Sequence, residues 1–193
     1  MPRTARHKAE TRQRILAAAG RRFRTAGLEG AGVLEIMAAA GLTHGGFYAH
    51  FASKDALATA ALEAALEEGR TSWLAGLAGL PPADAYRQIV GRYLCRAHRD
   101  EVGAGCAMAA LASELARQDA ATRAAFERGF RATIAALEAA MPEAGGMAPR
   151  ERALATMALA LGGLLLARMV ADRELSDSIL LACRRAALKA LGH

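Results

Sequence analysis

The chain of 193 residues is long enough for one domain with its own core, or for one domain with a small module added. Ala and Leu dominate its 53% of hydrophobic residues, aromatic residues reach only 5% and charged residues 23%, a balance that favours helices and excludes wholesale disorder. The net charge of +6 is concentrated at one end, since residues 1–24 carry +7 and the rest −1, which is typical of proteins that bind nucleic acid or an anionic membrane.

Four apolar residues recur at helical spacing within residues 8–26 and predict an amphipathic helix: they are Ile15, Leu16, Ala19 and Phe23. Gly27 is placed to end this helix. The next predicted helices span 33–40, 44–51 and 54–77. Thr43 and Ser53 precede the last two, and we expect their hydroxyl groups to act as helix N-caps.

Pro81 and Pro82 end the long helix and open the next one. The later predicted helices span 84–98, 106–118, 120–140, 148–171 and 175–191. The predicted fold class is therefore all-α, with about nine helices and no strand. The longest apolar run, from Met157 to Ala167, is shorter than the roughly 20 residues of a membrane helix, so we expect no membrane span.

The helix at 33–40, the turn Gly41-Leu42-Thr43 and the helix at 44–51 have the outline of a helix-turn-helix. Gly45 and Gly46 are weak helix formers, and their missing side chains let the backbone approach a base edge or a phosphate. Phe47 and Phe51 are expected to face inward, whereas the remaining polar rings point toward a groove: these are His44, Tyr48 and His50. Taken singly, each residue is typical of ordinary packing, but in this order they favour DNA binding.

The stretch from Gly41 to Leu57, with the preceding helix from Thr11 to Gly27, resembles the DNA-binding domain of the TetR family of bacterial transcriptional regulators. The resemblance covers about residues 8–62. It implies an N-terminal helix-turn-helix DNA-binding domain of three helices at 1–53 and a C-terminal helical domain at 54–193 for ligand binding and dimerisation. It further implies a homodimer that binds palindromic, double-stranded operator DNA as a repressor and is released by an unknown small-molecule or thiol-reactive effector.

The resemblance also assigns roles in DNA binding. Thr43 and His44 begin the recognition helix, Gly45 and Gly46 approach the bases, and the remaining contacts come from Tyr48, His50 and Lys54, the last as a phosphate clamp. The chain departs from the family at Gly32-Val33-Leu34, where many members carry polar residues, which shifts the expected affinity to the basic N-terminal segment. Arg3 and Arg6 are candidates for an arm that contacts the DNA backbone or minor groove, and a solvated tail is the alternative.

An apolar ligand pocket is expected in the C-terminal region, although core packing explains the same residues. Its candidate lining residues are Trp73, Tyr86, Val90, Tyr93, Met108 and Phe126. Cys106 opens a predicted helix, where the helix dipole lowers a thiol pKa, so it is a candidate redox sensor; a small buried side chain is the alternative. Cys95 and His98 have the spacing of a ligand pair, but no second pair accompanies them, so no metal and no cofactor are expected.

The odd number of cysteines, three in all, and the lack of a signal peptide favour a cytoplasmic protein without structural disulfides. The sequence lacks the glycine-rich phosphate loops, the zinc-binding His-Glu-x-x-His pattern and the Gly-x-Ser-x-Gly nucleophile motif, so an enzyme is not expected. Two other classes stay open: a helical protein that binds a small molecule without DNA, and a cysteine-dependent enzyme.

Overall fold

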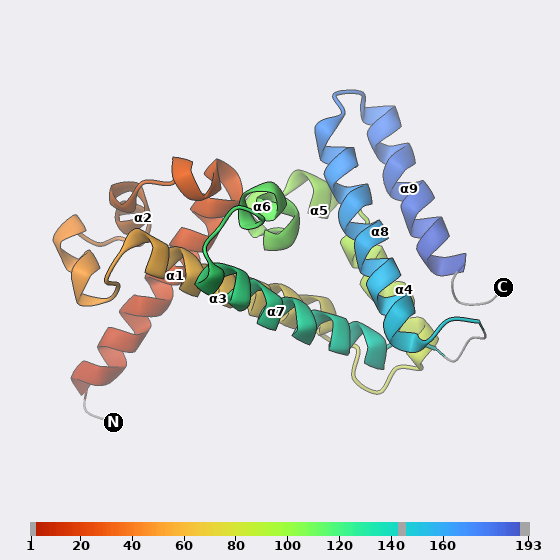
Figure 1. Cartoon of the computed structure of the whole chain (residues 1–193), viewed down its shortest axis with the longest axis horizontal. Coiled ribbons are helices and arrows are strands. Elements are labelled where there is room, and N and C mark those ends of the chain that lie inside the picture. The colour runs from red at the N-terminus through yellow and green to blue at the C-terminus, as the bar shows by residue number, and fades with distance from the viewer. Residues whose placement is uncertain (1–2, 143–145, 190–193) are drawn as a thin grey trace.

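The computed structural model describes residues 3–142 and 146–189. Within these ranges the chain is all-helical, as predicted, with nine α-helices, two 3-10 helices and no strand. Figure 1 shows the N-terminal helices gathered at one end of an elongated molecule and the last two helices at the other. The elements are α1 (Arg3–Gly30), α2 (Val33–Ala39), η1 (His44–Ala49), α3 (Lys54–Leu74), α4 (Pro82–Tyr93), α5 (Arg96–Asp100), η2 (Val102–Ala104), α6 (Ala107–Leu115), α7 (Ala120–Ala139), α8 (Pro149–Met169) and α9 (Arg173–Lys189).

The three-helix unit of α1, α2 and η1 closes over the start of α3. The apolar stripe predicted on α1 is buried, and it packs with apolar residues that follow it in the chain, among them Ile36, Met37, Phe47, Phe51 and Leu57. Gly27 interrupts α1 with a backbone φ of 77° and ψ of 170°, outside the helical region. Because glycine alone adopts such a conformation without strain, this position ends the regular helix as predicted.

Helix α3 connects the two ends of the molecule. It packs against α1 at one end and then runs alongside α7 (Figure 1). Helices α8 and α9 form an antiparallel pair at the far end, and α6 packs between α1 and α8. The buried apolar side chains form one continuous cluster through all of these elements.

Two predicted helices differ in the structure. The segment predicted as a helix over 44–51 is a 3-10 helix, and the expected cap by Thr43 is wrong, since its side chain makes no capping hydrogen bond. Two adjacent glycines and a length of six residues favour the tighter 3-10 form over a full α-helix. Ser53 does cap α3, because its hydroxyl accepts a hydrogen bond from the Ala56 N–H at 3.0 Å.

The predicted helix over 84–98 is divided into α4 and α5. Leu94 leaves the helical conformation with φ of −95° and ψ of 64°. Cys95 then acts as the N-cap of α5, where its sulfur accepts from the His98 N–H at 3.5 Å. The break therefore places His98 on a separate short helix next to α6.

Candidate nucleic-acid interface and effector cavity

Tyr48 is a strongly exposed ring of the helix-turn-helix. Its side chain is 71% exposed, while Phe47 and Phe51 on either side of it are 1% and 5% exposed. The rings of Phe47 and Phe51 are stacked with centroids 6.0 Å apart, and Phe47 meets Tyr48 edge to face at 5.1 Å. The buried rings thus fix η1 from beneath and hold Tyr48 toward solvent, as the sequence predicts.

Gly45 and Gly46 leave open surface beside Tyr48. Neither has a positive φ. A Cβ atom at Gly45 would have no described heavy atom within 4 Å, and one at Gly46 would meet only the Met37 side chain at 3.8 Å, an ordinary contact. The packing of the isolated chain therefore explains neither glycine, and the surface above them is free for a partner.

The remaining predicted DNA contacts lie on the same end of the molecule. Thr43 and His44 are exposed, and His50 is half-buried with its Nδ1 atom lacking a hydrogen-bond partner in the described part of the chain. Arg6 is exposed on α1 in an ion pair with Glu10 at 2.9 Å. Arg3 begins α1, but its side chain lies outside the described residues.

Basic side chains also hold the three-helix unit together. Lys54 Nζ donates to the Glu29 carbonyl at 2.9 Å, and Arg14 donates to the Ala40 carbonyl at 2.5 Å. The Arg12 guanidinium lies 4.8 Å from the centre of the Phe51 ring, a cation–π contact. These cations therefore fix the relative positions of α1, α2 and α3 while adding positive charge to this end of the molecule.

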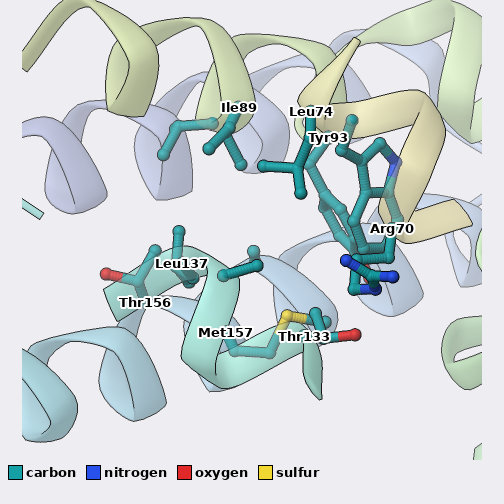
Figure 2. A pocket seen from close by; sticks show the side chains of 12 residues that line it. Arg70, Leu74, Ile89, Tyr93, Thr133, Leu137, Thr156 and Met157 are labelled. Atoms are coloured by element: carbon teal, nitrogen blue, oxygen red, sulfur yellow. The ribbon is translucent and has the colours of Figure 1, made fainter. Parts of the chain in front are cut away.

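A narrow cavity lies between α3, α4, α7 and α8 (Figure 2), in the region where the sequence predicts a ligand pocket, and is called the effector cavity for that expectation. Its free volume is about 30 Å³, room for a water molecule or two. Its walls are almost wholly apolar, and the hydroxyl groups of Thr133 and Thr156 are already hydrogen-bonded to the Gly129 carbonyl at 3.0 Å and the Tyr86 hydroxyl at 2.8 Å. It is lined by Arg70, Trp73, Leu74, Ile89, Val90, Tyr93, Thr133, Ala136, Leu137, Thr156, Met157 and Ala160.

Half of the pocket residues proposed from the sequence line this cavity: Trp73, Val90 and Tyr93. Tyr86 lies just behind the wall, where its hydroxyl also donates to the Ala187 carbonyl at 3.0 Å. Met108 is buried in α6 and Phe126 stacks on Phe130, both away from the cavity lining. Sequence reasoning missed the wall contributed by α7 and α8, which carry no aromatic residue at these positions and whose two threonines are typical of ordinary helix packing.

Cys106 is the N-cap residue of α6, but the lowered thiol pKa expected there is wrong. The residue is 3% exposed, and burial raises the pKa of its thiol above the ordinary value. Desolvation disfavours the thiolate more than the helix terminus favours it. Cys106 in this state is therefore a buried small side chain, poorly suited to act as a nucleophile.

His98 joins α4, α5 and α6 through both ring nitrogens. Its Nδ1 donates to the Tyr93 carbonyl at 2.7 Å, and its Nε2 accepts from the Cys106 N–H at 2.9 Å. This pair of contacts requires a neutral ring, and burial lowers the pKa of His98 in the same direction. Neither nitrogen is free for a metal, and no group of three metal-ligating side chains occurs among the described residues.

Glu114 is a contact residue that the sequence does not reveal. Its carboxylate on α6 accepts a hydrogen bond at 2.7 Å from the Leu28 N–H, which the break at Gly27 leaves outside the regular helix. A Cβ atom at Gly27 would stand 2.7 Å from the same carboxylate, so glycine is also needed there for space. α6 is thus hydrogen-bonded to the end of α1.

Helices α8 and α9 expose several large apolar side chains. No charged residue occurs from Ala153 to Ala167, and α8 is the one described helix long and apolar enough, by length and composition, to cross a membrane. Part of that apolar surface lies in the core, and the rest is exposed. A Cβ atom at Gly162 would have no described heavy atom within 4 Å. The exposed large apolar residues here are Leu154, Leu166, Met169, Leu175 and Leu181.

Comparison with known proteins places these features in one family. The model of bacterial regulatory proteins of the tetR family matches residues 15–61, and that of the C-terminal domain of LmrA/YxaF-like transcriptional regulators matches residues 82–178. No curated protein matches the chain.

Solved structures agree along nearly the whole chain. A TetR transcriptional regulator from Chloroflexus aurantiacus is 28% identical, with a TM-score of 0.75 and 95% of each chain covered. Reduced NemR from E. coli is 26% identical, with a TM-score of 0.74, 91% of this chain and 96% of NemR covered. A TetR-family regulator from Cytophaga hutchinsonii shares the fold at 19% identity, with a TM-score of 0.77 and coverage of 95% and 96%. The chain therefore belongs to the TetR family of transcriptional regulators, with a helix-turn-helix DNA-binding domain followed by a ligand-binding C-terminal domain.

Proposed function

We propose that this protein is a repressor that binds palindromic operator DNA as a homodimer and is released by a small apolar effector. Residues 1–53 would form the DNA-binding unit and residues 54–193 the ligand-binding and dimerisation unit. The observation that carries the proposal is the exposed Tyr48 beside the open surface at Gly45, on a short helix fixed by buried rings. An exposed ring on a rigid support loses little conformational entropy when it binds.

The major groove of B-form DNA, about 12 Å wide, admits a single helix with its side chains directed at the base edges. In our proposal η1 enters this groove. Tyr48 and His44 then face bases or the sugar-phosphate wall, and Gly45 allows close approach of the backbone. Lys54 uses one N–H for the Glu29 carbonyl and has two left for a phosphate at the start of α3, where the helix dipole also attracts anions.

The exposed face of α8 and α9 supports homodimerisation. The charge-free segment of α8 and the exposed leucines of α9 are stabilised when a second copy covers them, and an isologous contact of this kind closes as a two-fold dimer. The open position at Gly162 permits close approach of the partner helix. A two-fold protein is matched by a palindromic DNA site, with one recognition helix in each half.

The effector cavity indicates the class of ligand. Its threonine hydroxyls are already paired within the protein, so an uncharged, mainly apolar molecule suits it. At about 30 Å³ the cavity must widen to admit such a molecule, which moves α4, α7 or α8 apart. An effector that prefers the widened state by about 1–3 kcal/mol would then shift the protein away from DNA.

Selection of bound sequences from random duplexes tests the proposal. We expect recovery of an inverted repeat, with binding that weakens steeply as salt is raised. Recovery of a single unpaired half-site would contradict the homodimer, and no enrichment at all would contradict sequence-specific binding. Repeating the selection with apolar compounds identifies an effector as the compound that abolishes enrichment.

A further inference from the structure

A second and larger cavity, the junction cavity, lies where α1 meets the C-terminal domain. It has a volume of about 540 Å³ and, unlike the effector cavity, a polar wall. It is lined by Arg24, Ala65, Glu68, Gly69, Ser72, Trp73, Ala75, Arg92, His98, Ala104 and Gly105. The proposed function above makes no use of it.

Arg24 on the wall is a largely buried cation that forms no ion pair among the described residues, although the exposed Glu68 carboxylate on the same wall attracts it from a longer distance. The residue is 7% exposed, and its Nε donates to the Gly103 carbonyl at 2.6 Å. Its Nη1 and Nη2 make no hydrogen bond or ion pair with the described residues, and they are not fully buried, so they are accessible from the cavity. Burial lowers the pKa of Arg24, which reflects the cost of holding its charge away from water. An anion placed against these two nitrogens offsets that cost.

The rest of the wall is fixed and carries a further positive charge. Arg92 donates from Nη1 to the Trp73 and Ala75 carbonyls, at 2.8 Å each, and from Nη2 to Gln88 at 3.1 Å. It therefore stays in place whether or not the cavity is filled. His98 is neutral, as described above, and the exposed Glu68 is the single carboxylate of the wall, so the lining has a net positive charge.

Trp73 supplies an apolar surface next to these charges. Its ring meets Tyr93 edge to face, with centroids 4.9 Å apart, and lies between the two cavities as part of both linings. A ligand with a flat or apolar body can therefore pack on the indole while its charged end reaches Arg24.

We propose that the junction cavity binds a small organic oxyanion, a carboxylate or a phosphate, held by the two terminal nitrogens of Arg24, with its apolar body against Trp73. This site is separate from the effector cavity. Because Arg24 belongs to α1 and Trp73 to α3, the ligand would contact both the DNA-binding unit and the C-terminal domain.

Trp73 is the only tryptophan of the chain, so its fluorescence reports on the cavity directly. We would titrate the intact protein, without DNA, with benzoate, phenyl phosphate, inorganic phosphate and benzamide. Saturable fluorescence changes with benzoate or phenyl phosphate, and none with the neutral, nearly isosteric benzamide, are expected. The preferred anion distinguishes a carboxylate from a phosphate ligand. Equal binding of benzamide, or no binding of any anion, would overturn the proposal.

Variants locate the binding. Arg24→Gln should weaken the preferred anion about tenfold or more, the usual effect of losing a charge-assisted hydrogen bond, while Arg21→Gln, an exposed arginine on the same helix, should not. Gly69→Leu should abolish binding by filling the cavity without touching Arg24, since a Cβ atom there makes only an ordinary contact with Trp73 at 3.9 Å. Far-UV circular dichroism verifies that each variant folds. Unchanged affinity in the folded Gly69→Leu protein would place the anion elsewhere, whatever the outcome of the operator selection.

Discussion

The two ends of this molecule both expose large apolar side chains, but their surroundings differ. At the DNA-binding end, Tyr48 is an exposed ring next to two glycines, and basic residues of α1 and α3 lie on the same unit. At the far end, the exposed leucines of α8 and α9 accompany a segment of α8 with no charge over fifteen consecutive residues, from Ala153 to Ala167.

The comparison shows that an exposed apolar side chain does not by itself indicate which partner binds there. A ring with a hydroxyl group among cations suits a polyanion with polar edges, whereas exposed leucines beside a charge-free segment suit another apolar surface. In our proposal, DNA therefore binds one end and a second copy of the chain the other.

The largest effect is expected at the apolar end. Leu166→Glu places a charge within the proposed dimer interface, where its desolvation is costly. We expect a monomer in sedimentation analysis and operator affinity reduced about 100-fold, since one half-site then binds alone. Leu80→Glu, on an exposed leucine in the loop after α3, is the matched control and should stay dimeric. A Leu166→Glu protein that remains a dimer would show that another face is used.

Tyr48→Ala tests the other end. We expect operator affinity to fall about 10- to 100-fold, the range of one specific groove contact. The ring is 71% exposed, so the thermal midpoint and the dimer mass should hardly change. Retained affinity, measured by titration of a labelled operator, would remove Tyr48 from the interface.

Gly45→Ala sharpens the same assignment, because the folded chain has room for the added methyl group. Stability should be unchanged or slightly higher, since alanine favours helix. Operator affinity should fall about tenfold if the backbone at Gly45 lies against DNA. Gly30→Ala, outside η1, serves as the control. Equal affinity of both variants would mean that the backbone does not approach DNA so closely.

The smallest effect concerns the connection between the ends. Burial lowers the pKa of His98 below its usual 6.5 in the folded protein, so below that pH the unfolded chain binds more protons. The free energy of unfolding should therefore decrease as the pH falls from 6.5 to the pKa of His98 in the folded protein, and the steepest slope corresponds to the uptake of one proton on unfolding. Denaturation measured at several pH values should show this slope weakened in His98→Gln. An identical slope in the variant would assign it to other groups.

Local patterns predicted most of the helices. The spacing of Ile15, Ala19 and Phe23 requires a buried stripe on α1, and the order Phe47, Tyr48, Phe51 places one ring outside and two inside. The break after α4 was not predictable, because it depends on contacts between elements: Arg92 binds the carbonyl groups at the end of α3, and His98 binds α6.

The cavities were the least predictable part. The effector cavity joins Ile89 and Leu137 with Met157, three apolar residues from different helices that are indistinguishable in sequence from ordinary core. In the sequence, Arg24 cannot be distinguished from the other basic residues of α1, and only the tertiary structure shows that it is buried. The same reason explains the error at Cys106, where a helix terminus is visible in the sequence and burial is not.

The hydrogen bond from the Leu28 amide to Glu114 has a mechanical consequence. If α6 moves and takes the Glu114 carboxylate with it, the Leu28 N–H loses its hydrogen-bond partner, unless the segment between Gly27 and the start of α2 moves as well. A movement of α6 would therefore move the end of α1 and, in the proposed dimer, change the distance between the two recognition helices.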